Sequence, residues 1–600
     1  AASAMGSSGL AITDRDGLYG AVKHIGACIA VGISPIVGVN LKITGEQDLG
    51  RVVILAHGHN RGLGWATLCR IVSLATSRKG RKKETSLSIH ELASFFEDQA
   101  NCTILLGLES SLSRLVLKEP GQAKQLCEFW KEQFPTPGSL AIEVVNHMTE
   151  PGLIGSTKHA RAMLDLAAAT GISAVMTNAV RYIEPDGALT ADVLDSARHL
   201  EPLGLFEPQP NAQAWLKPVS KIAALALEVT EDTKRSMALI ENTEQLASNC
   251  FLDPEQDCGW NQPKTPEKSA LGITGNPFEC SGKNPFSHHW RYPEIKAAEL
   301  ATVQHQLSKE LISVNKLGFS TYFLTVADVA QMIRDMRIRI SARGSGAGSL
   351  INYLLGISGV DPVAEGLLFE RFLSTERSTL PDIDIDVESA RRHEIYRAIF
   401  RRYGGNRVTL LSMQSTYRGR GAVRDGGLAL GLEDEQIDEI AKNMWRFSAR
   451  NFRTELNQKP ELAEFSKLTE TDRKLNLLVD ITQRLDRLPR HISMHPCGVI
   501  LGDSSLLDLT PTEPSGMGLP MSQFDKDDMD PMGFLKLDVL GVRMQSAMAY
   551  TVKEIKRVKQ VDLDLDRVDK DDPAVYKMIR TTNTLGLFQI ESPGQRELTG

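Results

Sequence analysis

The sequence lacks three features that mark membrane and secreted proteins. No stretch approaches the roughly 18 consecutive apolar residues that a membrane-spanning helix needs, so no membrane partner is expected. The eight cysteines are scattered without a CxxC pair, which indicates reduced thiols in a cytosolic protein rather than a disulfide framework or a zinc ribbon. The first residues carry neither a charged n-region nor a long apolar core, so no signal peptide is predicted.

The balance of charge and hydrophobicity is that of a soluble globular protein. The net charge of −7 argues against a protein coated with nucleic acid, although local basic tracts are compatible with it. Hydrophobic residues make up 42% and charged residues 24%, which excludes a disordered, collagen-like or coiled-coil chain. At about 100–200 residues per domain, the 600 residues predict about three to five domains.

Changes of pattern along the chain predict several domains of mixed type. Short apolar runs alternate with helical stretches over residues 1–215, which predicts an α/β layer or barrel. Residues 250–292 are polar and rich in Gly and Pro, as in a linker or long loop. Residues 416–490 are expected to be mainly helical, and strand-like runs return over 494–545.

An alternating acidic segment is the strongest sign of chemistry. LPDIDIDV (380–387) predicts a strand with apolar side chains on one face and Asp382, Asp384 and Asp386 on the other. Carboxylates about 6.5–7 Å apart repel one another unless cations neutralise them. Their oxygens suit Mg²⁺, and two such ions about 3.5–4 Å apart are common in nucleotidyl transfer. An exposed acidic edge strand is the alternative.

A glycine- and serine-rich turn precedes this strand. ARGSGAGSLINYLLG (342–356) combines the Arg343 guanidinium, the Ser345 and Ser349 hydroxyls and an apolar helix whose free N–H groups are expected to face the turn. Its glycines, which permit close approach of a ligand, are Gly344, Gly346 and Gly348. The combination favours a phosphate cradle over a P-loop, because no GK[ST] follows. A flexible loop is the alternative.

The turn and the strand together indicate a nucleotidyltransferase. A Gly-Ser turn followed about forty residues later by an Asp-x-Asp strand is the arrangement of polymerase-beta-like nucleotidyltransferases, which use a third carboxylate on a neighbouring strand. GFLKLDVLG (533–541) offers Lys536 and Asp538 on one face of a strand. We expect Asp538 to be the third metal ligand and Lys536 a phosphate contact, with a structural Lys–Asp pair as the alternative.

A basic tract follows the acidic strand. Residues 391–424 contain nine arginines and one acidic residue, a local charge of +8. Arg418, Arg420 and Arg424 lie in a polar turn that opens a helix, next to Tyr417, and Arg490 follows in a later segment. Such a tract predicts contacts to a nucleic-acid backbone, with Tyr417 stacking on bases. A solvated helix face is the alternative.

These motifs resemble the bacterial C-family DNA polymerases, represented by the polymerase III alpha subunit. The likeness is dense from about residue 310 to 600 and rests on these segments: GFSTYFL (318–324), RGSGAGSL (343–350), GVDPVAEGLLFERFLSTERSTLPDIDID (359–386), AVRD (422–425), QFDKDD (523–528), LKLDVLG (535–541) and FQIESPGQREL (588–598). It implies a polymerase-beta-like palm in two parts, a helical thumb and the start of the fingers. The implied boundaries are 293–415 and 494–545 for the palm, 416–493 for the thumb and 546–600 for the fingers.

The resemblance also implies roles for individual residues. Catalytic metal ligands fall on Asp384, Asp386 and Asp538, with two Mg²⁺ ions as cofactors. The implied nucleotide contacts are Arg343, Gly344, Ser345 and Lys536. The implied activity is template-directed DNA synthesis on primer–template DNA with dNTPs, in replication or translesion repair. A non-catalytic DNA-binding scaffold is the alternative.

The same resemblance implies where the protein acts in the cell and how far its chain extends. It places the protein in the bacterial cytoplasm, associated with the nucleoid, and implies binding to a sliding clamp and other replisome or mutasome proteins through a part beyond Gly600. We therefore expect the chain to be a window of a longer protein. Val387, Val539 and HPCGV (495–499) depart from the usual pattern and suggest a divergent, error-prone type.

Residues 1–215 resemble the second part of a PHP (polymerase and histidinol phosphatase) domain, an irregular α/β barrel, followed by a connector over 216–292. AITDRDGLYGAV (11–22), ISPIVGVN (33–40) and MTNAVRYI (176–183) carry the likeness. The positions of the usual metal ligands hold Arg15, Asn40, Ala179 and Arg181. Arginine has no lone pair for a metal and alanine has no ligand atom. We expect a degenerate barrel without metal or phosphoesterase activity, although a PHP-type phosphoesterase is the alternative.

One histidine pair in this region carries a separate expectation. His57 and His59 form an HxH, the kind of pair that binds metal in such domains, but at the wrong place in the sequence. We therefore expect both side chains to lie at the surface.

Overall fold

The computed structural model describes residues 1–77, 84–97, 99–206, 208–272, 291–292, 295–374, 380–442, 444, 448–565, 568 and 571–600. The chain forms two compact units, each assembled from segments far apart in sequence. The first unit comprises Ala1–Gln262, Leu410–His495 and Ser505–Met532, and the second Pro263–Thr409, Pro496–Ser504 and Gly533–Gly600. Within the described ranges, no helix has the length and apolar character to cross a membrane.

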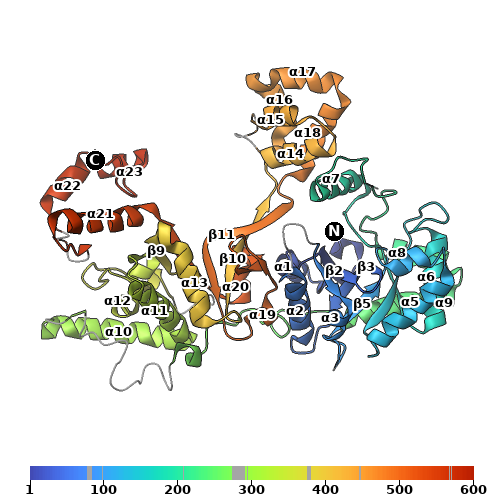
Figure 1. Ribbon diagram of the computed structural model, residues 1–600, viewed down its shortest axis with the longest axis horizontal. Coiled ribbons are helices and arrows are strands. Elements are labelled where there is room, and N and C mark those ends of the chain that lie inside the picture. The colour runs from blue at the N-terminus through green and yellow to red at the C-terminus, as the bar shows by residue number, and fades with distance from the viewer. Residues whose placement is uncertain are drawn as a thin grey trace. The chain divides into compact units, whose positions relative to one another are not determined.

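A mostly parallel sheet organises the start of the first unit (Figure 1). Its order is β1 (Gly9–Arg15), β2 (Ser34–Thr44), β3 (Asp48–Ala56), β5 (Cys102–Leu106), β6 (Leu140–Val145) and β7 (Ser173–Thr177), with β4 (Ser86–Ser88) beside β2. Only β3 runs antiparallel to its neighbours. Every residue of β5 is buried, as in a strand covered on both faces, whereas no residue of β1 is fully buried.

Helices alternate with these strands, as the sequence predicts. They are α1 (Ala21–Ala30), α2 (Leu63–Ser77), α3 (Ile89–Ala93), α4 (Ser111–Leu115), α5 (Pro120–Gln133), α6 (Thr157–Thr170), α8 (Val219–Thr230) and α9 (Thr233–Asn249). Local signals set their ends: the Ser156 side chain accepts from the His159 N–H at the start of α6, and Gly171 ends it with a left-handed φ of 69°.

The segment after α9 packs on the first sheet instead of running freely. Cys250 and Cys258 are fully buried. The Asp257 carboxylate accepts hydrogen bonds from the backbone N–H groups of His59 (3.0 Å) and Gly62 (3.2 Å). The polar composition of residues 250–292 predicted a linker or long loop. In the described part of this segment, the polar Asp257 side chain bonds to the backbone of the first unit. The rest of that prediction, residues 273–290, lies outside the described residues.

A helical cluster forms a second part of the first unit (Figure 1). It contains α14 (Gly419–Ala429), α15 (Asp434–Lys442), α16 (Phe452–Gln458), α17 (Ala463–Thr471) and α18 (Arg473–Leu485). Helix α7 (Ala188–His199) packs against α14 and α18, with the fully buried Val193 in their common core. The N–H of Leu203 donates to the Ala429 carbonyl at 2.9 Å, so the segment after β7 is part of this cluster's base.

Short strands complete the first unit. Strand β13 (Pro520–Asp525) lies between β12 (Thr512–Pro514) and β10 (Val408–Thr416). Helices α19 (Leu506–Leu509) and α20 (Met529–Met532) flank them. The Lys23 ammonium of α1 contacts the carboxylates of Asp525 (3.0 Å) and Asp528 (2.9 Å). The QFDKDD motif thus anchors this strand to α1.

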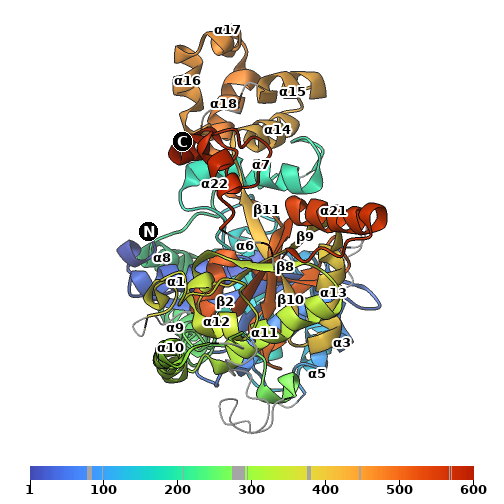
Figure 2. The ribbon, with the colours of Figure 1, turned by 90° about the vertical axis from the view of Figure 1, so that its left-hand side faces the viewer.

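The second unit is built around four strands in the order β11 (Pro489–Leu501), β14 (Leu535–Val542), β9 (Asp384–Glu388) and β8 (Ile340–Arg343). Strand β14 is parallel to β9 and antiparallel to β11, while β8 is antiparallel to β9. In Figure 2, α11 and α12 lie on one side of β8 and β9, and α21 lies on the other. The helices are α10 (Ala297–Leu317), α11 (Ser320–Asp335), α12 (Leu350–Leu354), α13 (Arg392–Tyr403), α21 (Arg543–Lys559), α22 (Pro573–Arg580) and α23 (Pro593–Thr599).

The acidic strand is shorter than predicted. Strand β9 begins at Asp384, whereas the alternation predicted a strand from residue 380. Pro381 has no N–H to give a sheet, and its carbonyl accepts the buried Tyr322 hydroxyl instead of a neighbouring strand. Asp382 therefore precedes the strand and is exposed.

Candidate active site

A row of side chains crosses the four-stranded sheet of the second unit. Asp384 of β9 lies in register with Asp538 of β14 on one side and Arg343 of β8 on the other, and Asp538 is paired in turn with Gly498 of β11. Paired residues on strands about 4.8 Å apart present their side chains on the same face. Gly498 adds no side chain to this row.

The alternation predicted for β14 is observed. Leu535, Leu537 and Val539 are buried on one face, and Lys536 and Asp538 are partly exposed on the other. This places both polar residues on the face that carries Asp384.

Two cations contact these carboxylates directly. The Arg343 guanidinium lies 3.3 Å from Asp386 Oδ1. The Lys536 ammonium lies 3.3 Å from Asp538 Oδ2 and 3.6 Å from Asp382 Oδ1. The structure therefore brings together the predicted metal ligands and the predicted phosphate contacts.

The surroundings raise the pKa of two carboxylates, Asp384 and Asp386. Burial and the neighbouring Asp538 raise the pKa of Asp384, and burial raises that of Asp386 although Arg343 opposes it. Burial would lower the pKa of Lys536, but Asp538, Asp382 and Asp384 raise it above its ordinary value. The site as a whole favours added positive charge.

The donor set fits divalent metal ions. Asp386 Oδ1 and Asp538 Oδ1 are buried and accept no hydrogen bond. The Arg343 guanidinium meets Asp386 Oδ1, which leaves Asp538 Oδ1 as the oxygen of this pair without a partner among the described residues. Such an oxygen is costly unless a cation or donor meets it, and carboxylate oxygens are the hard ligands that Mg²⁺ prefers. Across the described residues, however, no three His, Cys, Asp or Glu side chains converge into a ready-made metal site. The aspartates share a face without converging, and Arg343 holds Asp386.

The glycine turn lies beside Asp384. Gly344 opens the turn Gly344–Gly348 with a left-handed φ of 80°, and a Cβ there would lie 3.9 Å from Asp384 Oδ2. Ser345 is exposed at the turn. The expectation that the following helix offers free N–H groups to the turn was wrong. The N–H groups of Leu350 and Ile351 donate to the buried Glu310 carboxylate at 3.0 and 3.1 Å.

The predicted DNA-binding arginines differ in their surroundings. Arg418 and Arg420 are exposed at the start of α14, and no ion pair to another described residue engages them. Arg424 pairs with Asp438 at 2.6 Å on the surface. These three side chains belong to the first unit.

Arg490 and Tyr417 are engaged internally. Arg490 makes a bidentate pair with Asp425 at 2.9 and 3.0 Å, and its guanidinium lies 5.6 Å from the centre of the Tyr417 ring. Tyr417 is only 2% exposed and donates its hydroxyl to Asp425 at 2.8 Å. The expectation that Tyr417 stacks on bases was wrong, because the helical cluster buries its ring.

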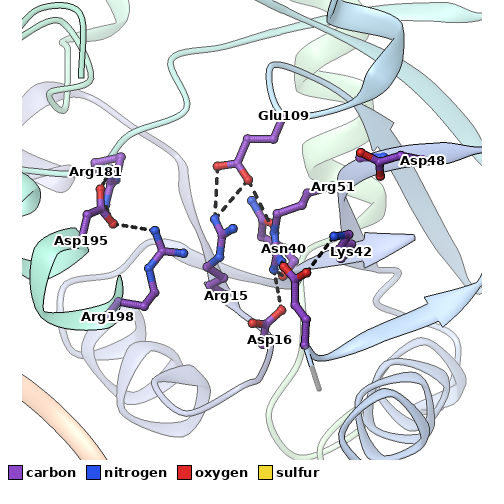
Figure 3. A network of polar contacts seen from close by, with 12 residues as sticks. Arg15, Asp16, Asn40, Lys42, Asp48, Arg51, Glu109, Arg181, Asp195 and Arg198 are labelled. Carbon is purple, nitrogen blue, oxygen red and sulfur yellow. Dashed lines mark hydrogen bonds and ion pairs between the residues drawn. The ribbon is translucent and has the colours of Figure 1, made fainter. Parts of the chain in front are cut away.

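Arginines and carboxylates form a network beside β1 and β2 of the PHP-like sheet (Figure 3). Arg15, in register with Asn40, lies 3.1 Å from Glu109, and Arg181 pairs with Asp195 at 2.7 Å. Arg51 donates to Asp16 at 2.5 Å and to the Asn40 side chain at 2.7 Å. Guanidinium groups thus meet carboxylates at Arg15 and Arg181, two of the positions that the resemblance aligns with metal ligands.

Sequence reasoning missed Arg51, which is only 6% exposed. The available signal was an arginine inside the apolar strand RVVILA. It also misjudged His57, which is half-buried and lies 2.8 Å from the Thr103 hydroxyl, whereas His59 is exposed as expected.

Comparisons with known proteins agree with this arrangement. The PHP domain family matches residues 1–147, the bacterial DNA polymerase III alpha NTPase domain matches 287–541, and the bacterial DNA polymerase III alpha subunit finger domain matches 544–600. Models of the bacterial DNA polymerase III alpha subunit thus match most of residues 287–600. The sheet with Asp384 and Asp538 falls within the second of these matches.

Curated relatives extend the match over nearly the whole chain. The chain is 31% identical to an error-prone DNA polymerase 2 of Agrobacterium fabrum, over 99% of its own length and 51% of that protein. It is 32% identical to an error-prone DNA polymerase 2 of Rhizobium meliloti, with the same coverage of both. It is also 32% identical to an error-prone DNA polymerase of Pseudomonas fluorescens, over 100% and 53%. The chain therefore spans about half the length of these relatives.

Proposed function

We propose that the protein is a template-directed DNA polymerase that adds deoxynucleotides to a primer 3′ end by metal-dependent nucleotidyl transfer. The observation that supports this most is the row Arg343–Asp384–Asp538 across three adjacent strands, beside a glycine turn. In this proposal the four-stranded sheet is the palm, α14 to α18 form the thumb, and α21 to α23 begin the fingers. The names of the relatives favour the error-prone type.

Each side chain has a role that its position supports. Asp384, Asp386 and Asp538 would hold two Mg²⁺ ions through carboxylate oxygens. Bound there, the metal supplies a lower pKa for the primer 3′-hydroxyl and neutralises negative charge in the transition state. Arg343 and Lys536, which now neutralise Asp386 and Asp538, are placed to bind the triphosphate, and Ser345 offers an exposed hydroxyl to it. Gly344 keeps the turn close to Asp384.

The first unit would hold the primer–template. Arg418 and Arg420 are the best-placed contacts, because they are exposed and without an ion pair to any described side chain. Arg424 can exchange Asp438 for a phosphate, since both side chains of that pair are about half exposed. Arg490 acts mainly through Asp425, by fixing the start of α14. A sliding clamp and other replisome or mutasome proteins are the expected partners of the complete protein.

The two rival functions have weaker support. A phosphoesterase in the PHP-like domain would need metal ligands where Arg15 and Arg181 already pair with carboxylates. A non-catalytic scaffold has no need to keep the buried Asp538 Oδ1 without a hydrogen bond on the face that carries Asp384.

Primer extension by the complete protein tests the proposal. The wild type should incorporate the nucleotide that the template dictates, and Asp384→Asn should abolish incorporation. Asp382→Asn is the matched control, since that side chain is 63% exposed and lies outside β9, and it should retain most activity. Extension that ignores the template, or an unaffected Asp384→Asn protein, would reject the proposal. Release of phosphate from a phosphoester, without primer extension, would favour the phosphoesterase.

A further inference from the structure

A buried carboxylate lies beneath the glycine turn of the candidate active site. Glu310, in the second half of α10, is 0% exposed. Its Oε1 accepts from Leu350 N–H at 3.0 Å and from the Gln306 side chain at 2.9 Å. Its Oε2 accepts from Ile351 N–H at 3.1 Å and from the Ser349 hydroxyl at 2.9 Å. Four donors therefore converge on one carboxylate.

These bonds continue into the turn itself. Ser349 and Leu350 directly follow Gly344–Gly348 in the chain. The Ser349 side chain accepts from Asn352 N–H at 3.3 Å, and the Asn352 side chain donates to the Gly346 carbonyl at 2.9 Å. Gly346 in turn faces Ile383, the residue before the acidic strand. Hydrogen bonds therefore lead from Glu310 through Ser349 and Asn352 to Gly346 in the turn.

Burial outweighs the four hydrogen bonds in its effect on the pKa of Glu310, which is raised above its ordinary value. Burial raises its pKa, and the four hydrogen bonds oppose that shift because they favour the charged form. Charge-assisted hydrogen bonds are stronger and more directional than neutral ones. A carboxylate that satisfies the first N–H groups of α12 also leaves those groups unable to bind a phosphate. The phosphate contacts must then come from the turn and from Arg343.

We propose that Glu310 is a positioning residue for the nucleotide, which fixes the turn Gly344–Gly348 through Ser349 and Asn352 so that Gly344, Ser345 and Arg343 meet the triphosphate. This inference rests on the proposed polymerase function and deepens it. Glu310 itself does not touch the substrate, so its effect should appear mainly in nucleotide affinity and less in the rate of the bound complex.

Steady-state primer extension by the complete protein tests this, with KM and kcat measured separately for one dNTP. Glu310→Gln keeps the side chain's shape but loses its charge and one acceptor. It should raise KM for the dNTP about tenfold, with a smaller change in kcat. Ser349→Ala, a milder change at the same anchor, should raise KM in the same direction by about threefold. Glu299→Gln, an exposed residue on the same helix, is the matched control and should change neither constant.

The outcomes separate this inference from the function on which it rests. A wild-type protein that does not extend primers would reject the proposed function. A wild type that does, together with a folded Glu310→Gln protein of unchanged KM, would overturn the role of Glu310 alone. If Glu310→Gln does not fold, Ser349→Ala decides, and an unchanged KM in that variant would overturn the inference. Thermal unfolding of each variant shows which case applies.

Discussion

Replacing Arg51 tests whether this buried arginine stabilises the PHP-like sheet through its network of hydrogen bonds and ion pairs. Arg51→Met removes hydrogen bonds to Asp16 (2.5 Å), to the Asn40 side chain (2.7 Å) and to the Asn40 carbonyl (2.7 Å). Each hydrogen bond to a charged group contributes about 1.5–3 kcal/mol when buried. The Asp16 side chain is 27% exposed, so solvent screening reduces its share. We expect a total loss of about 3 kcal/mol in the free energy of unfolding of the first unit.

Arg15→Met is the matched control for this prediction. It removes an arginine–carboxylate pair of the same network. The two side chains of that pair, Arg15 and Glu109, are 35% and 50% exposed. Such a pair contributes about 1 kcal/mol or less. Urea unfolding followed by tryptophan fluorescence measures both variants, because Trp65 and Trp130 are buried within the first unit. Equal losses in the two variants, or a loss below about 1 kcal/mol for Arg51→Met, would refute the reasoning.

Three further predictions concern the first unit. Lys23→Met removes the partner of Asp525 and Asp528, and burial raises the pKa of Asp528 to about 6. The ionised pair exists mainly above that pH, so urea unfolding should show a larger loss of stability at pH 8 than at pH 5, and equal losses would contradict this. Tyr417→Phe should cost about 1 kcal/mol of stability yet leave DNA affinity unchanged, because the ring is buried. Arg418→Ala combined with Arg420→Ala should weaken DNA binding. The slope of log affinity against log salt concentration should fall by about 1 per lost contact, with Tyr417→Phe as control. An unchanged slope would show that these two side chains do not contact DNA.

The sequence predicted well what depends on local pattern. Period-two alternation predicted the two faces of β14, and Asp384, Asp386 and Asp538 do share one face of a sheet. The strand–helix alternation of the first 215 residues likewise appears as a mostly parallel sheet with helices. The two faces of β14 are encoded within that single strand, so tertiary contacts did not alter them.

The errors arose where distant residues meet. Strand β9 starts late because the Tyr322 hydroxyl, about sixty residues upstream, takes the Pro381 carbonyl. The N–H groups after the glycine turn are occupied because Glu310 reaches them from about forty residues away. The Tyr417 ring shares its core with Val193, Ile481 and Leu485, which lie on helices distant in the chain. No local periodicity encodes such contacts.

In the proposed mechanism, Asp384 and Asp538, in register on adjacent strands, hold the metal that catalyses nucleotidyl transfer. Single-turnover incorporation of one template-directed nucleotide, measured against Mg²⁺ concentration, tests it most directly. Asp538→Asn should lower the maximal rate on the order of 10³-fold and weaken the Mg²⁺ dependence, while Asp382→Asn stays within a few fold of wild type. An Asp538→Asn protein with the wild-type rate and Mg²⁺ dependence would contradict the claim.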